Sequence, residues 1–142
     1  MLRAPLLAHL ALGLIALPSL AQPVGPGAPC PEPKLGACAT AATAALCIDQ
    51  PKGCVMKGTH DAWAFEVFTR ACAKDDAAGC RGLGWMGVRG RGGKPKLEDT
   101  LASYENGCKL GSAAACHELP TTLEGHVVTS GGKVTPAPDR AA

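Results

Sequence analysis

The feature that most constrains this chain is a repeated spacing of its cysteines. Cys72 and Cys80 lie eight residues apart, as do Cys108 and Cys116, and the second pair follows the first by 36 residues. A period of about 20–50 residues is typical of repeat arrays, in which stacked units share one hydrophobic core. The spacing therefore predicts repeated units, each with a loop short enough to be closed by a disulfide.

The first residues have the pattern of a secretory signal peptide. Arg3 is followed by an apolar run over residues 6–17, and small residues precede a predicted cleavage between Ala21 and Gln22. The run is too short for a membrane-spanning helix, which needs roughly 20 apolar residues. We expect residues 1–21 to be removed and the mature chain to be periplasmic or secreted, without stable insertion in a membrane. All eight cysteines follow the predicted cleavage, and these compartments allow disulfides to form.

Composition divides the rest of the chain. After cleavage of 21 residues from 142, a chain long enough for one small domain remains. Residues 22–33 form a Pro/Gly-rich linker by composition, and residues 124–142 are expected to be a disordered tail. Aromatic residues make up only 4% of the chain. A core with so few large side chains favours covalent crosslinks as an additional source of stability.

Hydrophobic periodicity predicts helices over residues 61–73, 80–88, 96–110 and 113–119. Thr59 or Asp61 can cap the first of these helices, and Pro120 is expected to end the last. The second helix contains three glycines that each lower helix propensity by about 1 kcal/mol relative to alanine, namely Gly82, Gly84 and Gly87. We expect these glycines to let another helix approach closely. The pattern predicts two helix-turn-helix units in tandem.

The stretch FEVFTRACAKDDAAGCRGLGWMGVRGRGGKPKLEDTLASYENGCKLGSAAACHEL resembles the Sel-1-like repeat, a relative of the tetratricopeptide repeat. It is most similar to a cysteine-rich branch exported by bacteria. The residues that carry the resemblance are Phe68, Cys72, Cys80, Leu83-Gly84 and the loop 90–93, followed by Tyr104, Cys108 and Cys116. The resemblance implies an all-α fold, a short α/α solenoid of two repeats over residues 61–96 and 97–123. It also implies that Cys72–Cys80 and Cys108–Cys116 are disulfides between successive helices.

The four N-terminal cysteines do not keep the period of 36. Cys30 and Cys38 are eight residues apart, and Cys47 and Cys54 are seven apart. We interpret residues 34–60 as a degenerate or capping repeat that contains an alanine-rich helix. Nearest-neighbour pairing is the first hypothesis for these cysteines, although four cysteines allow three connectivities.

The cysteine and histidine spacings do not indicate a metal or redox centre. No two cysteines lie two to four residues apart, as in zinc sites, and the redox motif Cys-x-x-Cys is absent from the sequence. His60, His117 and His126 are scattered and have no second ligand at metal spacing. We therefore predict neither a metal nor a cofactor.

A glycine-containing basic loop contains Arg89, Arg91, Lys94 and Lys96. We interpret it as a solvated connector between repeats, with counter-charges at Glu98 and Asp99. The mature chain has 13 basic and 12 acidic residues once Arg3 is removed, and an exported chain of this charge does not indicate a nucleic-acid partner.

The resemblance also gives an alternative function, because the cysteine-rich family has been associated with penicillin binding and weak β-lactam hydrolysis. Serine β-lactamases use the motif Ser-x-x-Lys. Its only match in the mature chain runs from Ser130 to Lys133, in a glycine-rich tail where we expect no preorganised pocket. Ser103 and Ser112 have no convincing base nearby. No catalytic residue is assigned.

We expect instead an exported, disulfide-stabilised scaffold that binds an unknown protein or peptide. In this hypothesis the concave face of the array, lined by the first helix of each unit, holds the partner segment. The candidate residues are Glu66, Thr69, Arg70, Ser103 and Asn106. An ordinary solvated surface is the alternative for these five positions.

Overall fold

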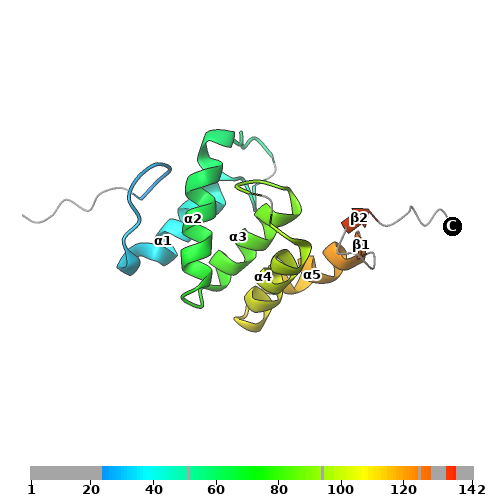
Figure 1. The fold of residues 1–142 in the computed structure, drawn as a ribbon. Helices are drawn as coiled ribbons and strands as arrows, with labels where there is room; N and C mark the ends of the chain where they lie inside the picture. Colours follow the sequence, from blue (N-terminus) through cyan, green and yellow to red (C-terminus); the bar gives the residue numbers. More distant parts are fainter. Residues whose placement is uncertain (1–23, 51, 94, 125, 129–133, 137–142) are drawn as a thin grey trace, which may run out of the picture.

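The computed structural model describes residues 24–50, 52–93, 95–124, 126–128 and 134–136. The packed domain in this part of the chain consists of the helices α1 (Leu35–Ala45), α2 (Asp61–Cys72), α3 (Ala77–Val88), α4 (Leu97–Lys109) and α5 (Ala113–Glu124) (Figure 1). Two short 3₁₀-helices precede α1 and α2, namely η1 (Glu32–Lys34) and η2 (Gly58–His60). The predicted all-α class is confirmed. The predicted signal peptide lies outside the described residues.

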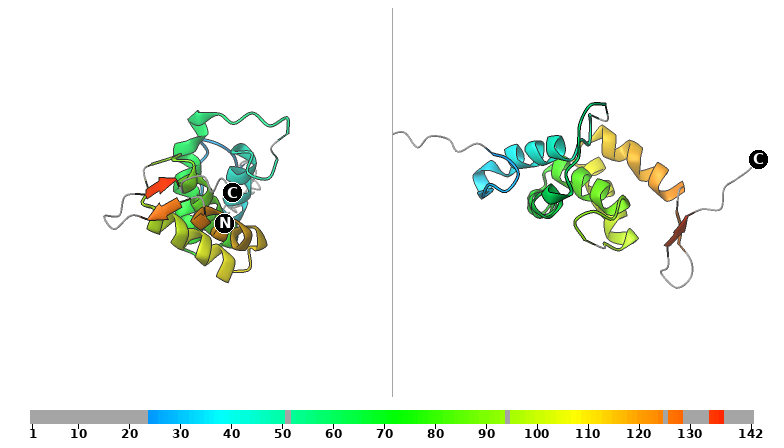
Figure 2. Two further views of the ribbon diagram at one scale, coloured as in Figure 1. Left: turned by 90° about the vertical axis from the view of Figure 1, so that its right-hand side faces the viewer. Right: turned by 90° about the horizontal axis from the view of Figure 1, so that it is seen from above.

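Helix α3 lies at the centre of the domain and contacts the other four helices. Helices α2 and α3 fold back on each other across a short turn, and α4 and α5 do the same. Figures 1 and 2 show α1 and α5 on opposite sides of the domain. The structure thus contains two helix pairs and one additional helix at the N-terminal side.

The 36-residue period of the cysteines is also the period of the backbone. Helix α4 begins 36 residues after α2, and α5 begins 36 residues after α3. The disulfide Cys72–Cys80 joins the last residue of α2 to the fourth residue of α3. Cys108–Cys116 likewise joins the end of α4 to the fourth residue of α5. These are the two pairings that the resemblance implies.

The turns inside the two helix pairs are built from equivalent residues. Asp75 and Gly111 adopt the left-handed backbone conformation that ends many helices, with φ of 59° and 98°. The next residue then caps the following helix. The Asp76 carboxylate accepts a 2.6 Å hydrogen bond from the backbone N–H three residues later, and the Ser112 hydroxyl accepts the equivalent bond at 3.2 Å. The same local chemistry therefore sets the angle between the helices in both pairs.

Helix α1 is equivalent to the second helix of each pair. Cys38 is the fourth residue of α1, as Cys80 is in α3 and Cys116 is in α5, and it forms a disulfide with Cys30. The residues before Cys30 that the structure describes form a turn and an irregular stretch instead of a first helix. In the described residues, the first unit therefore lacks the first helix that α2 and α4 provide in the later pairs.

The Pro/Gly-rich linker expected at residues 22–33 is wrong for the part that the structure describes. Val24 packs against the hydrophobic core, and Cys30 is only 8% exposed. The backbone N–H of Ala28 donates to the Gly25 carbonyl at 3.0 Å, which closes a turn. Apolar contact and the disulfide to α1 therefore outweigh the composition, which taken alone favours disorder.

The connection from α1 to α2 is much longer than the connection from α3 to α4. It spans residues 46–60, whereas the later one spans residues 89–96. The disulfide Cys47–Cys54 lies inside the longer connection and is the pairing given by the nearest-neighbour hypothesis. The N-terminal cysteines lose the period because this connection contains the additional residues.

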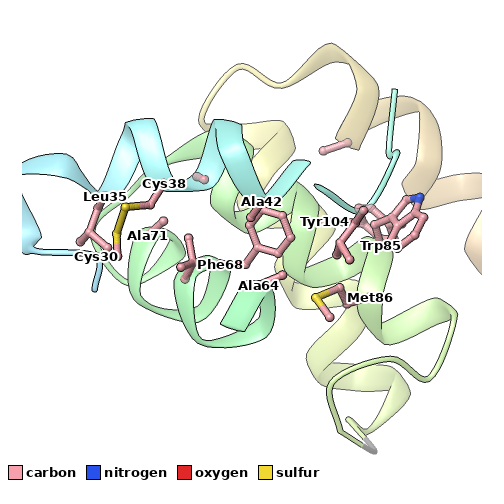
Figure 3. Close-up of a cluster of buried hydrophobic side chains, with 14 residues drawn as sticks. Cys30, Leu35, Cys38, Ala42, Ala64, Phe68, Ala71, Trp85, Met86 and Tyr104 are labelled. Atoms are coloured by element: carbon pink, nitrogen blue, oxygen red, sulfur yellow. A yellow bond between two sulfur atoms is a disulfide. The ribbon is translucent and has the colours of Figure 1, made fainter. Parts of the chain in front are cut away.

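The buried hydrophobic cluster takes residues from all five helices, most of them from α1 and α2, and Figure 3 shows it. Phe68 of α2 and Tyr104 of α4 occupy equivalent positions in the two pairs, and both are buried. A Cβ atom on Gly82 would lie 2.5 Å from the Phe68 ring, and one on Gly84 would lie 2.8 Å from the Tyr104 ring. The glycines of α3 therefore give the close approach that the sequence predicts.

The expectation that Pro120 ends the last helix is wrong, because α5 continues to Glu124. Proline removes one backbone N–H from the helix. The next turn is held by other contacts: Thr122 is buried, and its hydroxyl donates a 2.8 Å hydrogen bond to the Glu118 carbonyl. Tertiary packing thus extends the helix beyond a residue that usually breaks one.

The disordered tail expected over residues 124–142 contains regular structure in the part that the structure describes. Strands β1 (His126–Val128) and β2 (Val134–Pro136) pair antiparallel, with His126 opposite Pro136. Both strands contain valine and β2 also contains threonine, and β-branched residues favour extended backbone. Composition alone did not separate these short segments from the surrounding polar sequence.

Candidate functional site

The binding face predicted on the first helices is not continuous. Ser103 is 8% exposed, and its hydroxyl donates a 2.8 Å hydrogen bond to the Asp99 carbonyl within α4. It was expected to be exposed, but it occupies the side of α4 that packs inward. Arg70 donates a 2.8 Å hydrogen bond to the Cys30 carbonyl and is therefore engaged within the chain. The exposed members of the predicted face are Glu66, Thr69 and Asn106.

The basic loop is also engaged in internal contacts. The Arg89 guanidinium lies 4.0 Å from the centre of the Trp85 ring, in a cation–π contact. Arg91 forms a bidentate pair with Asp61, with its two nitrogens 2.7 and 3.1 Å from the carboxylate oxygens. Asp61 thus supplies the counter-charge that was expected from Glu98 and Asp99. No side-chain hydrogen bond caps the start of α2, so the capping predicted for Thr59 or Asp61 is not observed. Lys94 lies outside the described residues.

A hollow of about 270 Å³, here called the first hollow, opens between α1, α3 and the turn before α5. Its apolar walls come from Ile48, Ala77, Ala78 and Gly82, and its polar groups belong to Thr43, Asp49, Arg81 and Ser112. Pockets for small-molecule ligands usually span about 300–1,000 Å³. The first hollow is therefore suited to one or two side chains of a partner.

A second hollow of about 220 Å³ opens where the end of α3 meets α4 and α5. Its lining residues are Val88, Arg89, Tyr104, Glu118, Thr121 and Thr122. The lining is more polar than that of the first hollow, because Val88 is the one aliphatic side chain among its described lining residues, whereas an isoleucine and two alanines line the first hollow. Its volume also corresponds to a side chain or a short polar group.

Arg81 of α3 connects the two hollows. Its side chain is 15% exposed and pairs with carboxylates from two distant segments. One terminal nitrogen lies 2.7 Å from Asp49 Oδ1, and the other lies 2.8 Å from Glu118 Oε1. Arg81 lines the first hollow and Glu118 lines the second, so a half-buried ion pair forms the wall between them.

The pKa values of Tyr104 and Arg81 are both raised, so both groups are protonated at neutral pH. Burial raises the pKa of Tyr104 well above its usual value, and the neighbouring charge and hydrogen bond of Glu118 raise it further. Burial by itself lowers the pKa of Arg81, but its hydrogen bonds to Glu118 and Asp49 outweigh this effect and raise the pKa. Tyr104 is therefore a neutral hydrogen-bond donor, and Arg81 is a cation between two carboxylates.

The serines considered for catalysis have structural partners or lie outside the described residues. Ser103 bonds to its own helix, and Ser112 caps α5. The match from Ser130 to Lys133 falls in the undescribed part of the tail. Among the described side chains, no three His, Cys, Asp or Glu residues are grouped as metal ligands. None of the helices described has the length and apolarity needed to cross a membrane.

The Asp49–Arg81–Glu118 network was not predicted from the sequence. Arg81 lies 32 residues from Asp49 and 37 from Glu118, so no local spacing relates the three side chains. One feature of the sequence could have indicated this network. In the 36-residue repeat, Glu118 of α5 is equivalent to Gly82 of α3, which is buried. A charged residue at a buried position of the repeat is a candidate for a specific contact.

Comparisons with known proteins do not identify a relative of this chain. No family model matches it, and no match is found among curated proteins or among solved structures. The resemblance to Sel-1-like repeats thus stays a prediction from the sequence. The structure independently supplies a 36-residue period in both helices and disulfides.

Proposed function

We propose that this chain is an exported helical scaffold that binds a peptide or a segment of another protein. Four disulfides crosslink the described residues, which suits a protein of an oxidising compartment. Stacked helix pairs of this kind provide fixed surfaces for extended partners. The resemblance to exported Sel-1-like repeats supports the same function.

The observation that carries this proposal is the pair of hollows on either side of Arg81–Glu118. Each hollow, at about 270 and 220 Å³, is smaller than the roughly 300–1,000 Å³ of a typical pocket for a drug-sized ligand, and the ion pair lies between them. Successive side chains of one extended segment fit such a pair of hollows better than a single compact molecule does. The Arg81–Glu118 ion pair between the hollows offers polar groups that can set the position of a bound segment.

The first hollow favours an apolar side chain of the partner next to a basic one. Ile48, Ala77 and Ala78 offer apolar contact. The Asp49 side chain is 57% exposed, and its hydrogen bond to Arg81 is made through Oδ1, so the carboxylate is accessible to a partner's lysine or arginine. We therefore expect selected partner segments to combine an aliphatic residue with a neighbouring cation.

The test begins with peptides selected from a random displayed library against the oxidised protein. Their affinities are then measured by fluorescence anisotropy for the unaltered chain and for Ala78→Trp, which places an indole in the first hollow. We expect the affinity to fall at least about tenfold, or about 1.4 kcal/mol. Ala62→Trp, on an exposed position of α2 outside both hollows, is the matched control and should leave the affinity unchanged.

Two results would contradict the proposal. One is a library that yields no peptide above background from correctly oxidised protein. The other is a set of peptides whose affinity is the same in Ala78→Trp and in the unaltered chain. A selected consensus without an apolar residue next to a basic residue would contradict the assignment of the partner's chemistry to the first hollow.

A further inference from the structure

Arg89 differs from the other arginines that the structure describes because it has no carboxylate partner there. Three of the four described arginines form ion pairs within the chain, namely Arg70, Arg81 and Arg91. Arg89 is exposed, and its side chain makes no ion pair or hydrogen bond with a described residue. Its guanidinium instead lies 4.0 Å from the centre of the Trp85 ring. Arg89 is thus the described arginine whose hydrogen-bond donors are still free.

Stacking on Trp85 holds the Arg89 guanidinium in place without using these donors. An aromatic ring contacts the flat face of a guanidinium, whereas the N–H groups lie in its plane and point outward from the edge. Trp85 is only 5% exposed and belongs to the buried cluster, so its ring is a fixed support. The free N–H groups are therefore presented in a nearly fixed position, which lowers the entropy cost of binding a carboxylate.

The Arg89 guanidinium provides the unpaired charge of the second hollow. Arg89 lines this hollow together with Tyr104 and Glu118. Burial is the main cause of the raised pKa of Tyr104, and the charge of Arg89 opposes it, so the guanidinium lies near the phenol. Both carboxylate oxygens of Glu118 accept hydrogen bonds from Arg81, at 2.8 and 3.4 Å. The second hollow therefore has a paired carboxylate and an unpaired cation.

The two hollows thus carry unpaired charges of opposite sign. Arg81 pairs with two carboxylates, so one negative charge of this network is not balanced. The more exposed of the two carboxylates belongs to Asp49, which lines the first hollow. A segment that places a basic residue at the first hollow meets the opposite charge at the second. Charge complementarity then requires an acidic residue at the second hollow.

We propose that the second hollow binds an acidic side chain of the partner segment, and that Arg89 is the residue that selects it. The carboxylate accepts two hydrogen bonds from the free edge of the guanidinium, a geometry that arginine favours. Val88 is 37% exposed and offers apolar contact to the methylene groups of the same side chain. The inference rests on the function proposed above, because one segment occupies both hollows. For the same reason the carboxylate belongs to a side chain and not to a chain end.

The test is a parallel selection from one displayed peptide library with oxidised Arg89→Gln, oxidised Arg89→Glu and the unaltered chain. We expect the unaltered chain to enrich an acidic residue at a fixed spacing from the apolar and basic pair. Arg89→Gln should lose this enrichment, and Arg89→Glu should enrich a basic residue at the same position. Lys96→Glu is the matched control. Lys96 is exposed on the same connection and lines neither hollow, so its variant should keep the acidic residue.

A double-mutant cycle measures the contact itself. Fluorescence anisotropy compares a selected peptide, and the same peptide with glutamine at the acidic position, on the unaltered chain and on Arg89→Gln. We expect the neutral peptide to bind the unaltered chain at least about fivefold more weakly, and the two peptides to bind Arg89→Gln equally. Arg89→Lys keeps the charge and should retain part of the preference. The NMR resonance of the Trp85 indole N–H should shift more with the acidic peptide, with Trp63 as the internal reference.

The proposal is overturned if the selected peptides have no acidic residue at a fixed position, or if Arg89→Gln keeps the preference for one. It is also overturned if the preference is for a free C-terminal carboxylate and disappears when the peptides are amidated. In these cases the first hollow still stands as a binding site if Ala78→Trp lowers the affinity. A preference that depends on Arg89 without any effect of Ala78→Trp supports the carboxylate site and contradicts the first hollow. A library without binders contradicts both.

Discussion

The two helix pairs, α2–α3 and α4–α5, have the same backbone arrangement but differ in the helices that pack against them. Their helices begin 36 residues apart, their turns use equivalent residues, and each pair has the same disulfide. Helix α3 is packed between α2 and α4. No helix follows α5 in the described part of the chain. The comparison therefore isolates the effect of a neighbouring helix on otherwise equivalent positions.

The difference appears in the residues that face the next unit. Gly84 and Gly87 of α3 lie where added Cβ atoms would collide with side chains of α4. The equivalent positions of α5 hold Pro120 and Leu123, which are exposed. The repeat thus preserves turns and disulfides, whereas the size of the side chain at each position follows what packs against it.

The largest expected effect is the loss of a disulfide from either pair. Closing a loop of eight residues contributes about 2.5 kcal/mol in the chain-entropy model. We expect Cys108→Ala with Cys116→Ala to lower the free energy of unfolding by about this amount. Cys72→Ala with Cys80→Ala should cost about 1 kcal/mol more, because Cys80 is fully buried and Cys116 is exposed. Urea unfolding measures both variants, and equal losses would contradict the difference between the pairs.

Replacing the equivalent residues Gly84 and Pro120 by alanine should give changes of opposite sign. Gly84→Ala places a Cβ atom 2.8 Å from the Tyr104 ring, and overpacking of this kind costs about 1–3 kcal/mol. Pro120→Ala restores a backbone hydrogen bond at an exposed position of α5 and should stabilise the protein by about 1–3 kcal/mol. Thermal unfolding of the two single variants checks the signs. Destabilisation by Pro120→Ala would show that α5 needs the proline.

A smaller change in stability is expected for Gly36→Ala. This variant tests whether the loss of stability in Gly84→Ala comes from the lack of space or from the replacement of glycine itself. Gly36 lies in α1, and a Cβ atom there would meet only the Asp76 carboxylate, at 3.7 Å. Gly36→Ala should therefore stabilise the protein by up to about 1 kcal/mol through helix propensity. The melting temperature measures this change. A loss of stability similar to that of Gly84→Ala would mean that α1 packs more tightly than the structure shows.

The smallest effect at neutral pH concerns Tyr104, the only tyrosine in the sequence. Because burial raises its pKa in the folded state, the folded protein holds the phenol proton more tightly than the unfolded chain does. Its contribution to stability is complete below about pH 10, the usual tyrosine pKa, and is lost as the pH rises above it. Tyrosinate absorbance should appear near pH 10 in the unfolded chain and only at higher pH in the folded protein.

Glu118→Gln is the control for the titration of Tyr104. It removes the negative charge that raises the pKa, so the tyrosinate should appear at lower pH than in the unaltered protein. Identical titration curves for the folded and unfolded chains would contradict the burial of Tyr104 and its contact with Glu118. The test thus examines the second helix pair at its contact with α3.

Much of the helix arrangement could be predicted from the sequence. The four central helices follow from apolar spacing, and the glycines of α3 correctly indicated close packing. The ordered conformation of residues 24–30 and the extension of α5 beyond Pro120 were not predictable, because both depend on contacts with residues distant in the sequence. The candidate site was predicted least well: Ser103 is buried, and Arg81 was not considered.

The sequence by itself determined the properties that depend on residues close together along the chain. Cysteines eight residues apart, a left-handed residue followed by a capping side chain, and apolar residues at helical spacing all act within about two turns of chain. The tertiary structure decided which polar groups meet. Arg81 reaches Asp49 and Glu118 only because α3 is packed between distant segments. The Trp63 indole donates a hydrogen bond to the Ala28 carbonyl only because residues 24–30 fold onto α2. Half-buried polar groups need partners, and the partners available at each position are set by packing rather than by spacing along the chain.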